Sequence, residues 1–154
     1  VEVALLLHHD LGMAGGQAFD LAAEKKAPDE SGIITLQAMK TGALLRFACE
    51  AGAIISGSDV SERQRLRLFG EKIGLAFQLA DDLLDLTADA ATMGKATGKD
   101  AARGKGTLVA LRGEDWARAK LQEQVTEASD LLAPYGEKAA ILIAAARFIA
   151  ERKS

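Results

Sequence analysis

Apolar residues recur every three to four positions over most of the chain, a spacing typical of helices that bury one face. No stretch alternates in the manner of a strand. A glycine-rich segment at residues 12–16 predicts a break, and residues 88–106 predict a long loop. The sequence therefore predicts one all-α domain over residues 1–154. Its expected helices span residues 1–9, 17–25, 31–56, 61–87, 114–133 and 137–152.

Helix ends and helix faces give further expectations. Asp29 is placed to cap the helix after it, and Ser61 to Gln64 have the form of a capping box. Gly42 and Gly52 lie inside a predicted helix, where glycine costs stability unless close packing compensates. The apolar stripe of the last helix is expected to be core; it comprises Ala140, Ile141, Ala144, Phe148 and Ile149.

The stretch from residue 74 to 85 sets three aspartates inside an otherwise apolar helical pattern. Asp81 and Asp85 are four residues apart and share a face, with Asp82 beside them and Gln78 one turn away. Three carboxylates this close repel one another and lose hydration if buried, so we expect a positive group among them. Carboxylates are hard oxygen ligands, which makes Mg²⁺ the natural candidate. The plain alternative is a solvated acidic face, but the apolar flanks indicate a largely buried helix.

Basic side chains follow the aspartates in the glycine-rich segment at residues 88–106. They are Lys95, Lys99, Arg103 and Lys105. A diphosphate group is bound by a metal ion, which the acids can hold, and by positively charged side chains, which this segment supplies. Each of these features alone is weak evidence for a binding site, because a lysine is usually solvated and a lone glutamine is usually a satisfied interior amide.

Four motifs, in order, resemble those of the trans-prenyl diphosphate synthases. The sequence from Phe77 to Asp85 is similar to the second aspartate-rich motif of that family, and residues 92–100 resemble the loop that follows it. Lys40-Thr41-Gly42 resembles the lysine–threonine motif, and residues 12–21 resemble a glycine-rich element of bacterial farnesyl diphosphate synthases. The resemblance covers essentially the whole chain. It implies the C-terminal part of the isoprenoid synthase helical bundle.

The resemblance also implies a reaction and a set of roles. The family joins isopentenyl diphosphate to an allylic diphosphate, such as dimethylallyl or geranyl diphosphate, through an allylic carbocation. Asp81 would be the main Mg²⁺ ligand, with Asp82 and Asp85 acting mostly through metal-bound water. Lys40, Lys95, Lys99 and Lys105 would contact the allylic diphosphate. Thr41 and Gln78 would set oxygens near the allylic carbon, where dipoles stabilise a cation.

Several family features have no counterpart in these residues, namely the first aspartate-rich motif and the groups that grip isopentenyl diphosphate. The chain also starts with Val1 in the middle of a helical pattern. We therefore expect a C-terminal half that is inactive alone, from a homodimeric farnesyl diphosphate synthase. The alternatives are a geranylgeranyl diphosphate synthase and a non-catalytic regulatory subunit related to the synthases. A terpene cyclase is disfavoured, since the Asn- and Ser-containing motif of those enzymes is not visible.

Composition narrows the classes of protein. A net charge of −3 without a basic block argues against nucleic-acid binding. No apolar run approaches the roughly 20 residues of a membrane-spanning helix. The single cysteine, Cys49, excludes an internal disulfide framework and suits a reducing cytoplasm, where we expect the protein to act.

Overall fold

The computed structural model describes residues 13–23, 29–93 and 107–152, although the side chains of a few residues within these ranges, Lys40 among them, are not described. Every regular element in the described ranges is helical, which confirms the all-α prediction. The elements are α2 (Met13–Ala23), α3 (Glu30–Gln37), η1 (Ala38–Gly42), α4 (Ala43–Ile55), α5 (Val60–Met93), α7 (Leu108–Arg112), α8 (Glu114–Leu132), η2 (Ala133–Ala139) and α9 (Ala140–Glu151).

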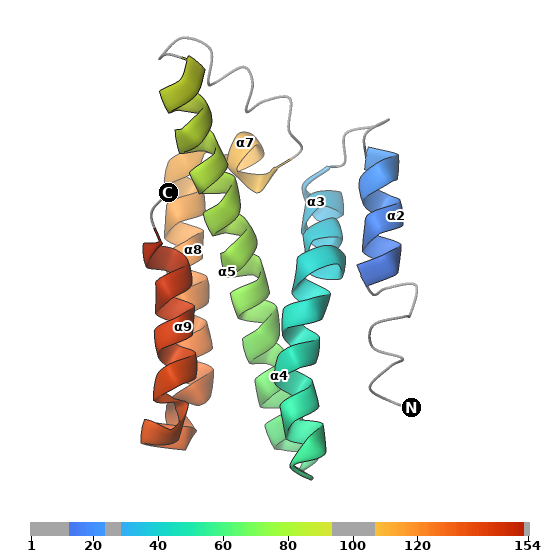
Figure 1. The fold of residues 1–154 in the computed structure, drawn as a ribbon, viewed down its shortest axis with the longest axis vertical. Helices are drawn as coiled ribbons and strands as arrows, with labels where there is room; N and C mark the ends of the chain where they lie inside the picture. Colours follow the sequence, from blue (N-terminus) through green and yellow to red (C-terminus); the bar gives the residue numbers. More distant parts are fainter. Residues whose placement is uncertain (1–12, 24–28, 94–106, 153–154) are drawn as a thin grey trace.

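Helix α5 runs through the middle of the molecule and packs against α4 on one side and α8 and α9 on the other (Figure 1). Its apolar residues supply much of the core, and burial of such side chains is the main force that holds the helices together. The buried members from α5 are Phe69, Ile73, Ala76, Leu79, Ala80 and Leu83. The predicted burial of the aspartate-bearing helix is therefore confirmed.

The crossing of α4 and α5 is close because glycines stand at the contact. A Cβ atom on Gly74 would lie 2.9 Å from the Cα of Gly42, and one on Gly70 would lie 2.6 Å from the Cα of Arg46. Any side chain at either α5 position would push the two backbones apart. The packing expected to compensate for Gly42 is thus present, whereas a Cβ on Gly52 would meet nothing within 4 Å.

The predicted helix over residues 31–56 is one continuous helix, but its middle is π-helical. The turn η1 covers Ala38–Gly42, and the backbone stays in the right-handed helical region where α3 enters it and where α4 leaves it. Such π-helical turns are rare and occur frequently at functional sites. This one contains Lys40 and Thr41, the motif that the sequence had singled out.

Two helix starts test the capping predictions. Asp29 caps α3 as predicted, because its Oδ1 accepts a hydrogen bond from the Gly32 amide at 2.8 Å. The capping box at Ser61 is wrong: Asp59 caps α5 instead, accepting from the Glu62 amide at 2.9 Å and from the Ser61 hydroxyl at 2.8 Å. These bonds, the amide bond first, hold the pKa of Asp59 below its usual value.

The carboxylate of Glu62 accepts a hydrogen bond from the hydroxyl of Tyr135, which ties η2 to the first turn of α5. Burial, followed by this hydrogen bond, raises the pKa of Tyr135 to about 12. Gly136 follows at φ 55°, a backbone conformation that glycine adopts without strain, and it makes a kink inside η2, at the break between the helices expected over residues 114–133 and 137–152.

Two other local predictions are wrong. The expected break at residues 12–16 lies partly within α2, which begins at Met13 and contains buried Gly16. Helix α5 continues to Met93, so the first residues of the expected 88–106 loop are helical, and residues 94–106 lie outside the described chain. The stretch between the expected loop and the helix expected from residue 114 is itself a helix, α7, whose Arg112 pairs with Glu30 at the start of α3 at 2.7 Å.

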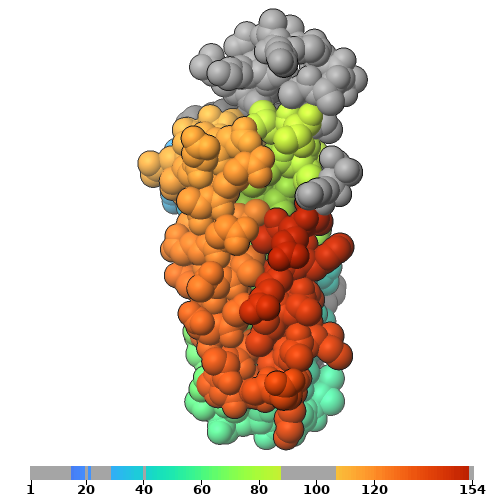
Figure 2. Space-filling model, turned by 90° about the vertical axis from the view of Figure 1, so that its left-hand side faces the viewer, coloured from blue at the N-terminus to red at the C-terminus, as the bar shows by residue number. Residues whose placement is uncertain are grey.

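The apolar stripe of α9 is mostly exposed rather than core. Ile141 is 83% exposed and Phe148 is 67% exposed, whereas Ala146 is buried. Figure 2 shows α8 and α9 lying side by side over one face of the molecule. The face of α9 that packs against the core carries buried Ala146 together with the partly buried Ile143, Ile149 and Ala150, so Ile149 is the member of the predicted stripe that does pack there. Among the helices of the described ranges, none has the length and apolar character needed to cross a membrane.

Candidate active site

The predicted site residues of α5 lie along one stretch of the helix, where its buried face gives way to solvent. Gln78, Asp81 and Asp82 are partly buried, and Asp85, one turn further on, is exposed. The core residues Leu79, Ala80 and Leu83 alternate with them and fix the orientation of the helix. The polar groups are therefore held at the surface of a rigid element rather than on a loop.

Asp81 has a positive partner from the far end of the chain. The guanidinium of Arg152, just after α9, pairs with Asp81 Oδ1 and donates to the backbone carbonyl of Phe77 at 3.2 Å. It also lies over the Phe77 ring, 4.4 Å from the ring centroid. The expectation of a positive group among the aspartates is thus met by a residue of the chain itself.

Asp82 also contacts a residue that sequence reasoning did not select. The amide of Gln37, the last residue of α3, donates to Asp82 Oδ2 at 3.2 Å. Gln37 is buried, and its Oε1 has no hydrogen-bond partner among the described residues. The amide nitrogen of Gln37 thus holds one oxygen of Asp82 toward α3, while its buried Oε1 carries the cost of an unsatisfied acceptor.

The lysine–threonine motif and the aspartates lie on helices that touch. Thr41 is partly buried in η1, and η1 packs against α5 through the contact of Gly42 with Gly74. The side chain of Lys40 lies outside the described residues, as do Lys95, Lys99 and Lys105 altogether. The two motifs thus lie on adjoining helical segments, and their service in one site stays a prediction.

A divalent metal fits the donors of this site only in part. The three aspartates are not arranged as a metal cage, since no three acidic, histidine or cysteine side chains within the described ranges group as metal ligands. Asp81 nevertheless keeps 40% of its side chain exposed, with one oxygen taken by Arg152. That arrangement suits Mg²⁺, which is usually held by one or two carboxylates together with substrate phosphates.

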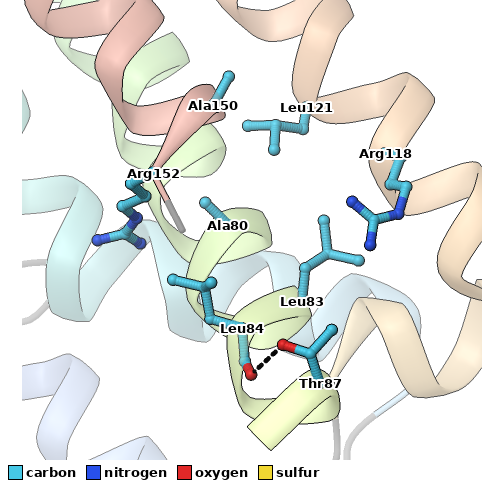
Figure 3. A pocket seen from close by; sticks show the side chains of 8 residues that line it. All are labelled: Ala80, Leu83, Leu84, Thr87, Arg118, Leu121, Ala150 and Arg152. Carbon is cyan, nitrogen blue, oxygen red and sulfur yellow. Dashed lines mark hydrogen bonds between the residues drawn. The ribbon is translucent and has the colours of Figure 1, made fainter. Parts of the chain in front are cut away.

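A cavity of about 280 Å³ lies beside the aspartates, between α5, α8 and the end of α9. Its floor is apolar, made by Ala80, Leu83 and Leu84 of α5. Figure 3 shows Arg118 and Arg152 on opposite sides of this cavity. The guanidinium of Arg118 is held by Glu114 at 2.7 Å, one turn earlier in α8.

Cys49 does not belong to this site. It is partly buried in α4, packs against the core, and has a pKa raised by burial. A thiol of this kind is unreactive, since the thiolate is the nucleophile. The interpretation of Cys49 as a small core residue is consistent with this placement.

Comparison with known proteins identifies the family. Residues 2–145 match the family described as Polyprenyl synthetase. The chain is 39% identical over 142 residues to a dimethylallyltranstransferase of Fischerella ambigua, covering 92% of this chain and 41% of that protein. It is 42% identical over 129 residues to the farnesyl diphosphate synthase of Escherichia coli K12, covering 82% of this chain and 43% of that enzyme.

A solved structure gives the same result. The crystal structure of an FPP/GFPP synthase from Zymomonas mobilis superimposes with a TM-score of 0.80 at 39% identity, covering 96% of this chain and 49% of that one. The chain thus spans 41% to 49% of the length of these three relatives. Sequence and architecture agree, and the chain belongs to the polyprenyl synthetase family.

Proposed function

We propose that the protein carrying this chain is a Mg²⁺-dependent short-chain prenyltransferase of the farnesyl diphosphate synthase type. In this proposal residues 1–154 are the C-terminal half of the synthase domain and show no turnover alone. The observation that carries it is the row of polar residues Gln78, Asp81, Asp82 and Asp85 on α5, facing away from its core side. The family of the chain and the names of its relatives support the reaction class.

The reaction breaks the C–O bond of an allylic diphosphate, and the diphosphate leaves with the electron pair. The double bond of isopentenyl diphosphate then attacks the allylic cation, and the product loses a proton. Mg²⁺, when bound, would neutralise the charge that develops on the leaving diphosphate. Asp81 would be its ligand on α5, and Asp82 and Asp85 would extend the acidic face around it.

The remaining residues would act by position and charge. Thr41 of η1 and Gln78 of α5 would direct oxygen dipoles at the allylic carbon, stabilising a cation without forming a bond to it. Lys40 would bind the allylic diphosphate together with lysines 95, 99 and 105, an assignment that rests on the family resemblance. The homodimer and the cytoplasmic location remain predictions.

The experiment that tests the proposal is Asp81→Ala in the complete protein, assayed with geranyl and isopentenyl diphosphates at saturating Mg²⁺. We expect kcat to fall by about a hundredfold or more, because the carboxylate acts where charge develops in the transition state. Asp130→Ala, which removes an exposed aspartate of α8, is the matched control and should retain wild-type turnover. Near-normal kcat for Asp81→Ala would remove α5 from the catalytic machinery.

Asp81→Ala should also change the stability of the metal-free protein. Three mutually repelling acids would make Asp81→Ala stabilising without metal, but Arg152 already compensates Asp81. Removing the carboxylate would leave a guanidinium with a buried, unpartnered Nε. We therefore expect Asp81→Ala to lower the metal-free melting temperature slightly rather than raise it, since a half-exposed ion pair contributes about 0.2–1 kcal/mol.

A further inference from the structure

We propose that Arg152 is a built-in counter-cation for Asp81, and that a divalent metal must displace its guanidinium in order to bind. Metal binding would thereby move the side chain of Arg152 away from α5. This inference rests on the proposed function, because it takes Asp81 to be a metal ligand. It assigns a role to a residue that none of the sequence motifs contains.

Arg152 occupies a defined position in the metal-free fold. Its side chain is only 20% exposed, with Phe77 below it and the carboxylate of Asp81 beside it. Phe77 and Asp81 are one helical turn apart on α5, so the guanidinium spans both residues on the same face. Because an arginine side chain is charged at any physiological pH, this pairing neutralises Asp81 whenever metal is absent.

A metal and this guanidinium compete for the same carboxylate. Mg²⁺ coordinates oxygen at about 2.0–2.1 Å, which would bring a double positive charge within a few ångströms of the guanidinium held on Asp81 Oδ1. The two cations repel, so each weakens the hold of the other on Asp81. Displacement of Arg152 relieves that repulsion.

The surroundings of Arg152 allow it to leave. The residue lies just beyond the last residue of α9 in a non-helical conformation, with φ −59° and ψ 134°. Its backbone N–H donates a hydrogen bond to the Phe148 carbonyl at 3.0 Å. Its Nε is buried without a partner in the described structure, so the present position leaves one donor unsatisfied. The neighbouring cavity of about 280 Å³, which Arg152 lines, offers space into which the side chain can turn (Figure 3).

The test is a titration of the complete protein with Mn²⁺ alone, followed by electron paramagnetic resonance. Mn²⁺ serves because it shares the preference of Mg²⁺ for carboxylate oxygen. Five proteins are compared: wild type, Asp81→Asn, Arg152→Gln, Arg152→Lys and Arg147→Gln. Arg147 is exposed on α9 and is the matched control for loss of one positive charge.

We expect Arg152→Gln to bind Mn²⁺ about two- to fivefold more tightly than wild type, the factor that a half-exposed ion pair contributes. Arg147→Gln should match wild type, and Arg152→Lys, which keeps the charge, should stay close to it. Without metal, Arg152→Gln should melt below wild type, and Mn²⁺ should raise its melting temperature by more than it raises that of wild type.

Unchanged Mn²⁺ binding by Arg152→Gln overturns the proposal, because Arg152 would then have no effect on metal affinity. Weaker binding also overturns it, because Arg152 would then orient Asp81 for the metal rather than compete with it. The failure of the proposed metal site has a different signature. If Asp81→Asn binds Mn²⁺ as tightly as wild type, Asp81 is not a ligand, and the counter-cation proposal fails together with that assignment.

Discussion

The close crossing of α4 and α5 can be tested with one pair of glycine substitutions. A Cβ on Gly70 would lie 2.6 Å from the Cα of Arg46 and 3.0 Å from the Leu45 carbonyl oxygen, both of them backbone atoms. Carbon atoms pack best at about 3.5–4.0 Å, so the helices must separate by roughly 1 Å to admit a methyl group. Gly52 also lies inside a helix, but a Cβ there would meet no atom within 4 Å.

The expected effects have opposite signs. Alanine is favoured over glycine in a helix by about 1 kcal/mol, a gain that both substitutions share. At Gly70 overpacking subtracts about 1–3 kcal/mol, and we expect the upper part of that range because backbone atoms cannot rotate away. Gly70→Ala should therefore destabilise the fold by about 1–2 kcal/mol, whereas Gly52→Ala should stabilise it by about 0.5–1 kcal/mol.

The assay is thermal unfolding of both variants and wild type under identical conditions. One kcal/mol shifts the melting temperature by about 2–4 °C in a domain of about 150–250 residues, so the two variants should differ by about 3–12 °C. The order of the three proteins is the decisive result. A Gly70→Ala protein that melts at or above wild type would show that the α4–α5 contact is looser than described and would refute the argument.

Two further predictions concern contacts around α5. Gln37→Glu sets a second carboxylate against Asp82, so it should lower the melting temperature at pH 7 and recover as acid protonates the new group; a pH-independent loss would contradict this. Because the pKa of Tyr135 is raised from 10.0 to about 12, its contribution to stability is complete below pH 10 and is lost between about pH 10 and 12. In Tyr135→Phe, the free energy of unfolding measured with urea should therefore fall less steeply over this pH range than it does in wild type. An equally steep fall in both proteins would refute the assignment.

The helices were predictable where one face is clearly apolar. The period of three to four residues located α5 and its buried side because its core residues are large and regularly spaced. It failed on α9, where Ile141, Leu142 and Phe148 are all exposed and apolar residues surround most of the helix. A pattern without a polar side cannot select the packed face, and the face used is the one that carries Ile143, Ala146 and Ile149.

The starts of two helices were predicted incorrectly, because more than one nearby residue could begin or cap each helix. Asp59 and Ser61 are both good capping residues, and the sequence does not decide between them. Gly15 and Gly16 read as a break, although α2 continues through both.

The candidate site was only half predictable. The carboxylates of α5 are adjacent in sequence, so their common placement follows from helix geometry alone. Arg152 and Gln37 reach them from 71 and 45 residues away, respectively, and no local pattern pairs such distant positions. In the sequence, neither an arginine after a helix nor a glutamine near a lysine–threonine pair indicates a binding site. Their contacts with the aspartates form only when the helices pack together.

The π-helical turn η1 has a consequence for insertions and deletions. A turn closed by bonds from each residue to the fifth residue beyond it holds one residue more than an α-helical turn. Deleting one residue within Ala38–Gly42 would therefore leave α3 and α4 in their present registers while converting the whole segment into one regular α-helix. Thr41 and Gln37 would no longer be offset by the wide turn, and the contacts that buried Met39 and Gly42 make there would change. One residue can thus enter or leave this turn while the helices on either side keep their registers.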